Sequence, residues 1–341
     1  MKNKFTFIDL FAGIGGLRIP FEELGGRCVF TSEQDKFAQQ TYEANFKEKP
    51  SGDITKIEIS DIPAHDLILA GFPCQPFSYA GLKRGFDDIR GTLFASVAMI
   101  AKYHRPKVIF LENVKGFKSH DKGRTFETVR RVIEEDLGYK LFYKALNARN
   151  FGLPQNRDRF FMIAFSEGSA MESFNWPEPL MTPTRVGDIL EKEPVDLKYT
   201  ISDRLWKSHK RRKRQHQTRG NGFGYSIFNS SSEYTSTISA RYYKDGSEIL
   251  IEQPDANPRK LTPREASRLQ GFPSDFIIPV SDVQAYKQFG NAVPVPVIRI
   301  LAKHVMDASH SLLTSDDQTS EHGFIEQQLS MLSSYGLSSN D

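Results

Sequence analysis

The setting of one cysteine suits covalent chemistry. Cys74 lies in the block Gly71-Phe72-Pro73-Cys74-Gln75-Pro76-Phe77-Ser78, between two prolines. Proline fixes its own backbone angle, so this block holds the thiol in a defined direction, which an inert packing cysteine does not require. We therefore interpret Cys74 as a nucleophile. Cys28 lies within an apolar run, and we expect it to pack as a small hydrophobic residue.

A glycine-rich turn near the N-terminus is typical of nucleotide binding. Gly13, Gly15 and Gly16 follow the apolar run 5–10, and such glycines let the backbone approach a ligand closely. Glu33 comes twenty residues after Gly13, where a carboxylate commonly accepts hydrogen bonds from ribose hydroxyls. Taken alone, the turn also fits a nicotinamide-dependent dehydrogenase or a turn that binds nothing.

The pattern of apolar residues predicts an α/β sheet that brings these two sites together. Phe126, Val129, Val132, Ile133 and Leu137 share the spacing of one helix face. Strands that alternate with helices favour a parallel sheet covered by helices on both faces. Ligands bind at the carboxyl edge of such sheets, where the glycine turn and Cys74 are both expected. Short apolar runs predict strands at residues 5–10, 27–31, 66–70, 108–112 and 159–165.

Composition divides the chain into four parts. Residues 1–176 form the predicted catalytic and cofactor-binding domain. Residues 177–283 are richer in Pro, Ser, Arg and Tyr, contain the basic run Lys207–Arg214, and are predicted to form a smaller inserted domain. Residues 284–310 return to a regular pattern and are expected to pack on the first domain. Residues 311–341 carry eight serines, five acidic groups and no Lys or Arg, a composition typical of disorder.

The net charge and the cysteine count indicate which kinds of partner and which cellular compartment suit the protein. The formal net charge is +3, and because the tail contributes −5, residues 1–310 carry +8. A basic body suits a phosphate-bearing partner, although many proteins with this balance bind no nucleic acid. The chain shows no secretory signal and no run that approaches the roughly 20 apolar residues of a membrane span, so we expect a cytoplasmic protein. Two cysteines fit a reducing compartment.

Six ordered blocks of sequence resemble those of one family. They are Asp9–Gly16, Gly71–Ser78, Glu112–Val114, Gln155–Arg159, Arg264–Pro273 and Gln288–Asn291. In their order and spacing, the chain resembles a bacterial DNA (cytosine-5-)-methyltransferase of the restriction-modification type. The resemblance extends to about Met306. It implies an α/β, Rossmann-like S-adenosylmethionine-dependent methyltransferase sheet with a smaller inserted target-recognition domain.

The resemblance implies a catalytic role for four residues. Carbon 5 of cytosine is a poor nucleophile, so the family adds a thiolate to carbon 6, and Cys74 matches that nucleophile. Glu112 matches the glutamate that contacts ring nitrogen 3, where partial burial is expected to raise its pKa. Arg159 matches the residue that holds oxygen 2, with Arg157 close to the thiol and the DNA backbone. The sequence does not identify the base that removes the carbon 5 proton.

The resemblance also implies the residues that bind S-adenosylmethionine. Asp53 and Ile54 are expected to meet the adenine after a third strand. Gln34 is a departure, because several relatives have an aromatic residue there. Apolar packing from Phe11, Ile54 or Leu93 is expected to replace adenine stacking, with weaker binding. Neither a metal nor a second cofactor is indicated. The predicted cofactor-binding residues are Phe11, Gly13, Gly15, Gly16, Glu33, Asp53, Ile54, Pro73 and Asn291.

Two regions are expected to contact double-stranded DNA. The segment 78–92 combines three glycines that permit hinge motion with basic residues that suit phosphates. The inserted domain is implied to recognise the DNA sequence, because Thr237 and Ile238 match the family's recognition signature. The basic run Lys207–Arg214 either contacts the DNA backbone or is a solvated surface. The residues predicted to contact DNA are Ser78, Lys83, Arg84, Arg90, Thr237, Arg241 and Tyr242.

Three other functions are weaker candidates. A tRNA methyltransferase of the related branch usually carries a Cys-Phe-Thr block, which this sequence lacks. A non-catalytic DNA-binding descendant usually loses the nucleophile or its acid, and both are present here. A dehydrogenase leaves the Pro-Cys-Gln-Pro block unexplained. The favoured function is therefore methylation of a specific double-stranded site by base flipping, by a monomer that pairs functionally with a restriction endonuclease without a stable complex.

Overall fold

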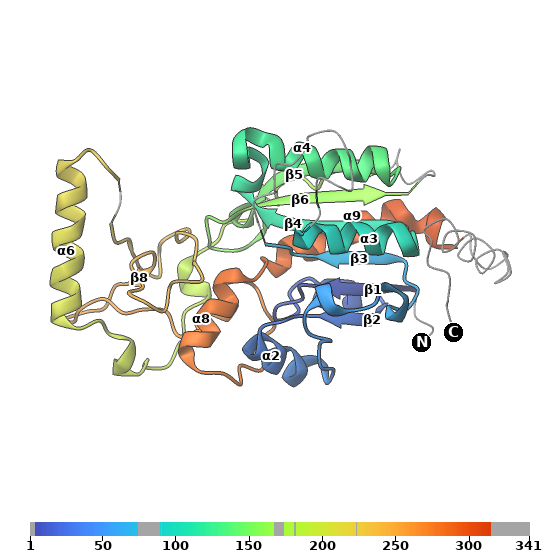
Figure 1. Cartoon of the computed structure of the whole chain (residues 1–341). Coiled ribbons are helices and arrows are strands. Elements are labelled where there is room, and N and C mark those ends of the chain that lie inside the picture. Colours follow the sequence, from blue (N-terminus) through green and yellow to red (C-terminus); the bar gives the residue numbers. More distant parts are fainter. Residues whose placement is uncertain are drawn as a thin grey trace, which may run out of the picture.

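The sheet of the protein has six strands. The computed structural model describes residues 4–73, 89, 91–166, 174–180, 182–222 and 224–314. The strand order is β2-β1-β3-β4-β6-β5, and Figure 1 shows that β6 runs against its neighbours. The strands are β1 (Phe5–Leu10), β2 (Gly26–Ser32), β3 (Leu67–Ala70), β4 (Val108–Val114), β5 (Lys140–Asn147) and β6 (Asp158–Phe165).

The prediction of a wholly parallel sheet is wrong at one edge. β1 to β4 pair in parallel, but β6 is antiparallel to both β4 and β5. Only residues 148–157 connect β5 to β6, including a short 3-10 helix, Ala148–Phe151. A parallel return needs a crossover of a dozen or more residues, so this short connection folds back as an antiparallel pair. All five predicted strands are confirmed within a few residues, and β5 was not predicted.

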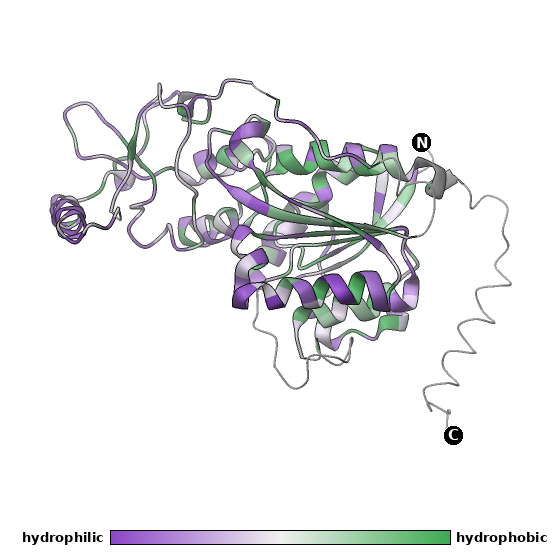
Figure 2. Cartoon of the chain, turned by 90° about the horizontal axis from the view of Figure 1, so that it is seen from above, coloured by the Kyte–Doolittle hydropathy of each residue, from purple (hydrophilic) through white to green (hydrophobic). Residues whose placement is uncertain are grey.

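Helices cover both faces of the sheet, as predicted (Figure 2). One face packs on α3 (Leu93–His104) and α4 (Arg124–Arg131), which a π-helical turn extends through Val132–Asp136. The predicted helical stripe from Phe126 to Leu137 lies buried on this face. The other face packs on α1 (Arg18–Glu23) and α9 (Val295–Thr314). In the described part of the chain, no helix is long and apolar enough to cross a membrane.

A smaller region lies beyond the carboxyl edge of β1 to β4 (Figure 1). Its core contains Ile238, Tyr242 and Leu261, and it is continuous with Ile14 of the glycine turn. The predicted boundary between residues 283 and 284 falls inside α8, and the buried residues of α8 belong to this core. The region contains α6 (Asp203–Thr218), β7 (Ile227–Phe228), β8 (Leu250–Ile251), α7 (Pro263–Leu269) and α8 (Asp282–Asn291).

The remaining elements are short, apart from α2 (Lys36–Phe46), which follows β2. α9 ends three residues beyond the predicted start of the acidic tail, and residues 315–341 lie outside the described residues. The short 3-10 helices are Ile54–Lys56, Ile59–Asp61, Val186–Asp188 and Leu197–Tyr199, and 3-10 turns interrupted by a kink span Lys115–Gly123.

Candidate cofactor and catalytic site

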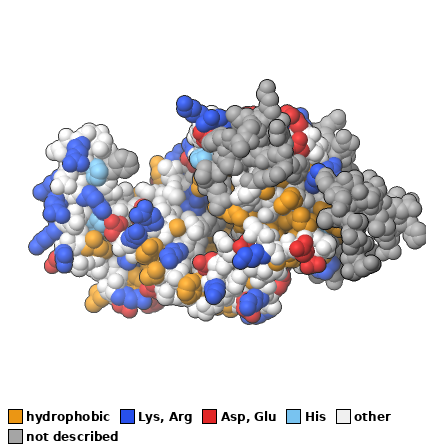
Figure 3. All heavy atoms as spheres, in the orientation of Figure 1, with side chains coloured by type: hydrophobic (Ala, Val, Ile, Leu, Met, Phe, Trp, Pro, Cys, Tyr) orange, Lys and Arg blue, Asp and Glu red, His pale blue; other side chains and the backbone are white. Residues whose placement is uncertain are grey.

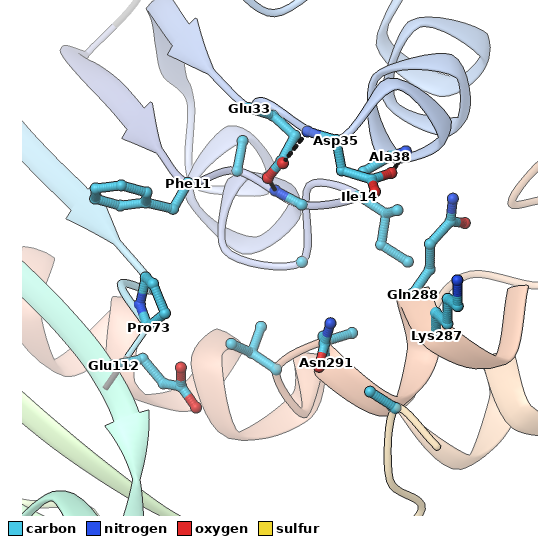
Figure 4. A pocket seen from close by; sticks show the side chains of 18 of the residues that line it. Phe11, Ile14, Glu33, Asp35, Ala38, Pro73, Glu112, Lys287, Gln288 and Asn291 are labelled. Atoms are coloured by element: carbon cyan, nitrogen blue, oxygen red, sulfur yellow. Dashed lines mark hydrogen bonds between the residues drawn. The ribbon is translucent and has the colours of Figure 1, made fainter. Parts of the chain in front are cut away.

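A cavity of about 880 Å³ opens at the carboxyl edge of the sheet. Its lining comes from the ends of β1 to β4 on one side and from the smaller region on the other. Figure 4 shows Glu33 and Phe11 on the side of the glycine turn, Glu112 near Pro73, and Asn291 across the cavity. The sheet edge therefore brings the glycine turn together with residues 71–73, the part of the Cys74 block that the structure describes.

The glycine turn is fixed by Glu33. Its two carboxylate oxygens accept hydrogen bonds from the backbone N–H groups of Gly13, at 2.8 Å, and Asp35, at 2.7 Å. Gly13 has a φ of +57° and open space where a Cβ would be, so its backbone faces the cavity without a side chain. Gly15 has a φ of +84°, which favours glycine, and a Cβ there would also lie 2.2 Å from the ring of Phe46.

The other predicted cofactor residues line the same cavity, with one correction. Asp53 and Ile54 lie between α2 and β3, and so precede the third strand of the chain instead of following it. Asp53 caps the 3-10 helix, which aligns Ile54 with the cavity. Gly16, Pro73 and Asn291 line the cavity as well. Phe11 and Leu93, the apolar substitutes expected beside Gln34, are also part of the lining.

These surroundings fit S-adenosylmethionine. The Gly13 backbone is open, Glu33 keeps lone pairs free after accepting one backbone hydrogen bond on each oxygen, and apolar side chains from Phe11, Ile54 and Leu93 lie in the same cavity. Carboxylates suit ribose hydroxyls and apolar side chains suit the adenine. Among the described residues, no cluster of His, Cys, Asp and Glu is arranged to hold a metal ion.

Glu112 is a buried carboxyl group at the end of β4. It is 7% exposed, and Arg159 Nε lies 2.9 Å from its Oε1. The two groups form an ion pair, but Oε1 has no hydrogen-bond partner among the described residues. Burial raises the pKa of Glu112, and the charges of Arg159 and Arg157 only partly oppose this effect. The Glu112 carboxyl group therefore holds a proton more tightly than an exposed glutamate does, and its Oε1 can still accept a hydrogen bond from a ligand.

Asn113 is a site residue that the sequence did not single out. Its side-chain amide donates a 2.8 Å hydrogen bond to the carbonyl oxygen of Phe72, and its own oxygen accepts from the Val114 N–H. Phe72 is two residues before Cys74 in the chain. Asn113 thus connects the strand that carries Glu112 to the segment that precedes the predicted nucleophile, Cys74. The only signal in the sequence was its place in the block Glu112–Val114.

Arg157 has different surroundings from those expected. Its side chain is fully buried, and its guanidinium donates to the carbonyl oxygens of Ile238, Gly290 and Ala292. A wholly buried side chain cannot reach the DNA backbone, so that part of the prediction is wrong for this structure. Arg159 is also largely buried and borders the cavity together with Glu112.

The structure describes three of the residues predicted to contact DNA, and two of them are exposed enough for such contact. Arg241 is exposed, and Thr237 is partly exposed and bonds to the backbone of Asn156. Tyr242 is fully buried; its hydroxyl donates to Ile249 and accepts from the Leu261 N–H. Its predicted contact with DNA is therefore wrong, and it is a core residue. Cys74, Ser78, Lys83, Arg84 and Arg90 lie outside the described residues.

Comparison with known proteins gives a consistent assignment. The family model described as C-5 cytosine-specific DNA methylase matches residues 5–307. The chain is 58% identical to the Type II methyltransferase M.DsaV of Dactylococcopsis salina, over 89% of this chain and 87% of that protein. It is 57% identical to M.SsoII of Shigella sonnei, over 91% of this chain and 82% of that protein.

Solved structures agree on the fold. The Entamoeba histolytica methyltransferase EhMeth superposes with a TM-score of 0.71 at 22% identity, over 89% of this chain and 98% of that chain. The S. pombe Dnmt2 methyltransferase gives a TM-score of 0.71 at 21% identity, with the same coverage. At these identities, the structural similarity shows a shared fold and nothing more. The match over residues 5–307 and the closely similar Type II enzymes show that the chain belongs to the C-5 cytosine-specific DNA methylases, which use S-adenosylmethionine as methyl donor.

Proposed function

We propose that this methyltransferase acts on a cytosine rotated out of the DNA duplex, through a covalent bond from Cys74 to carbon 6. The observation that carries the proposal is the buried carboxyl group of Glu112, which has a raised pKa and, on Oε1, no hydrogen-bond partner among the described residues. It lies on the strand that Asn113 connects to the segment before Cys74. The proposed proton donor lies at the end of β4, and the proposed nucleophile follows the neighbouring strand β3 in the chain.

The first step forms the carbon–sulfur bond. The Cys74 thiolate adds to carbon 6, and the electron pair of the 5,6 double bond moves into the ring toward nitrogen 3 and oxygen 2. The Glu112 carboxyl group gives its proton to nitrogen 3, and the Arg159 guanidinium stabilises the charge on oxygen 2. Because burial raises the pKa of Glu112, its carboxyl group holds a proton more readily than an exposed glutamate does. The ring is now an enamine with a nucleophilic carbon 5.

The second stage transfers the methyl group and releases the product. Bound S-adenosylmethionine supplies a methyl group on a sulfonium, and carbon 5 takes the methyl while the sulfonium sulfur keeps the bonding pair. A base, for which water suffices, removes the proton from carbon 5. The carbon–sulfur bond then breaks, the thiolate leaves from carbon 6, and Glu112 recovers its proton from nitrogen 3.

The depth of the site supports base flipping. Glu112 is 7% exposed, whereas carbon 5 of a cytosine in a duplex is held within the base stack. The base can meet a buried carboxyl group only after leaving the stack, at a cost of a few kcal/mol. The segment 78–92 is proposed to close over the base, with Lys83, Arg84 and Arg90 on phosphates. This segment lies largely outside the described residues.

The smaller region is proposed to read the DNA sequence. Thr237 and Arg241 line the cavity from that side, so base-reading residues adjoin the catalytic groups. Relatives named Type II methyltransferases support a functional pairing with a restriction endonuclease, whose cleavage this methylation would block, without a stable complex between them. Bisulfite mapping of DNA from cells that express the protein gives the methylated site directly.

Trapping with a fluorinated substrate tests the covalent step. In a duplex with 5-fluorocytosine at the mapped position, carbon 5 has no proton to lose after methylation, so the carbon–sulfur bond persists. We expect a denaturant-resistant adduct with wild-type protein and with Cys28→Ala, and none with Cys74→Ala. Cys28 is the matched control because it is the only other cysteine. An active enzyme that forms no adduct would show the proposed covalent step to be wrong.

A further inference from the structure

Three segments that are distant in sequence meet in one buried polar junction beside the cavity. They are residues 154–157 before β6, residues 235–240 of the smaller region, and residues 289–292 at the end of α8. Arg157 donates to Ile238 at 3.0 Å, to Gly290 at 2.9 Å and to Ala292 at 2.6 Å. One planar guanidinium thus holds the carbonyl groups of two separate segments.

Two glutamines complete the junction. Gln155 is fully buried; its oxygen accepts from the Ile238 N–H at 3.1 Å, and its amide donates to the Leu269 carbonyl at 3.0 Å. Gln270, also fully buried, donates to the Phe289 carbonyl at 2.7 Å. Apart from Arg157 Nε, the buried side-chain donors and acceptors of these three residues are satisfied. They specify one arrangement, because a displacement leaves further donors or acceptors unpaired at a cost.

Residues 235–240 and residues 289–292 are also in direct backbone contact. A Cβ on Gly290 would lie 2.3 Å from the Ser239 carbonyl carbon and 2.4 Å from the Ala240 nitrogen. The φ of Gly290 does not require glycine. Glycine is required because the backbone of residues 239–240 approaches so closely. The obstacle is backbone, which cannot rotate away as a flexible side chain can. A displacement of residues 239–240 must therefore be transmitted to Gly290.

Both segments form walls of the one cavity. Residues 237–241 line it from the proposed DNA-reading side, and residues 290–293 line it from the side of Asn291. DNA that orders the first segment would also order the second, which faces the cofactor. Contiguous packed and hydrogen-bonded groups of this kind can carry a coupling free energy between two ligands, and such coupling is reciprocal.

We propose that Arg157 is a positioning residue that couples DNA recognition to cofactor binding, by joining residues 237–240 to residues 290–292. Bound DNA strengthens cofactor binding through this junction, and bound cofactor strengthens DNA binding by the same factor. This inference depends on the proposed DNA-reading role of residues 237–241. It does not depend on the covalent step of Cys74.

Calorimetry with S-adenosylhomocysteine, the demethylated product, tests the coupling without turnover. It is titrated into the protein alone and into the protein saturated with a duplex that contains the mapped site. For wild type we expect the duplex to tighten binding at least about fivefold. The ratio of interest is the dissociation constant without duplex divided by that with duplex. We expect this ratio to fall close to one for Arg157→Lys, which keeps the charge but cannot hold three carbonyl groups, and for Gly290→Ala.

Gly222→Ala is the matched control, because a Cβ at this exposed glycine of the smaller region would meet nothing within 4 Å. We expect it to keep the wild-type ratio. Thermal unfolding and binding of S-adenosylhomocysteine without DNA identify folded variants; if Arg157→Lys does not fold, Gly290→Ala decides. A wild-type ratio in both variants overturns the proposal. So does an equal loss of DNA affinity with and without S-adenosylhomocysteine, because that is a defect of recognition alone.

Discussion

The side chain of Asn113 donates a 2.8 Å hydrogen bond to the main-chain carbonyl of Phe72, across 41 positions of sequence. This bond connects the end of β4 with the segment that leads to Cys74. Asn113 is 3% exposed and Phe72 is also 3% exposed, so water cannot replace the bond easily. The position of Phe72 relative to Glu112 thus depends in part on the side chain of the neighbouring residue Asn113.

Asn113→Ala is expected to lower kcat about tenfold while the Kd for S-adenosylhomocysteine stays nearly unchanged. Loss of the amide leaves the buried Phe72 carbonyl unpaired, at a cost of about 1–3 kcal/mol, and releases the segment before the nucleophile. Single-turnover methylation and calorimetry measure the two effects. Asn45→Ala, which also removes an amide bonded to backbone but lies away from the cavity, is the control. Equal losses of kcat in both variants would refute a specific role for Asn113.

Glu112→Gln is expected to lower kcat at least about 100-fold, because the amide cannot give a proton to the ring nitrogen. The same change is expected to make the folded protein more stable than wild type at alkaline pH. Burial raises the pKa of Glu112, so the folded state binds this proton more tightly than the unfolded state. Wild type therefore loses stability as pH rises from the ordinary glutamate pKa through the raised folded value.

The uncharged glutamine avoids this loss, so the difference in Tm between Glu112→Gln and wild type should grow with pH and vanish in acid. Glu134→Gln, at a partly exposed glutamate paired with Arg130, is the control and should show no such growth. Tm values measured across the pH range check the sign. A difference that shrinks as pH rises would mean that the pKa of Glu112 is lowered and not raised.

Local sequence signals predicted the parts of the fold that are apolar and continuous. β1, β3 and β4 are almost wholly buried, so they appear as unbroken apolar runs. β5 was missed because it is an edge strand whose residues Tyr143, Lys144 and Ala145 are exposed, which hides the alternation expected of a strand. The glycine turn and Glu33 were recognisable because their spacing is fixed by local geometry.

Roles that depend on distant partners could not be predicted in the same way. Arg157 resembles any arginine before a strand until three carbonyl groups, 81 to 135 positions away, are brought to it by folding. Tyr242 lies next to a recognition signature and carries a polar hydroxyl, yet that hydroxyl is satisfied in the core by Ile249 and Leu261. In both cases the residue type indicated which interactions the side chain can make, but tertiary packing determined its actual partners.

Gln34→Trp is expected to tighten cofactor binding about threefold to tenfold, because Gln34 is exposed, lines the cavity, and offers no aromatic face to the adenine. An aromatic pair contributes about 0.5–1.5 kcal/mol beyond its area. Calorimetry with S-adenosylhomocysteine in the absence of DNA measures the change. Lys36→Trp, an exposed site on α2 outside the cavity lining, is the control. A wild-type dissociation constant for S-adenosylmethionine well below about 1 µM without DNA would contradict the premise of weak binding.

Four exposed cations of α6 form one stripe, and their removal is expected to weaken DNA binding at low salt and to flatten its salt dependence. Arg204, Lys207, Arg211 and Arg214 are spaced three and four residues apart, so they share the helix face opposite the buried His209. Figure 3 shows Lys and Arg side chains gathered over this helix. Each phosphate contact contributes a slope of about 0.9 in log K against log salt.

Replacing all four by Ala should therefore reduce the slope by at least about one for a long duplex, with kcat on a short duplex unchanged. The matched control removes four exposed cations from β2, α2 and the segments beside them, namely Lys4, Arg27, Lys36 and Lys49, and should leave the slope near that of wild type. Both variants lose the same net charge. The comparison therefore separates a local contact with DNA from a general change in the protein's electrostatic field. Equal slopes in the two variants would mean that α6 is a solvated surface without contact to DNA.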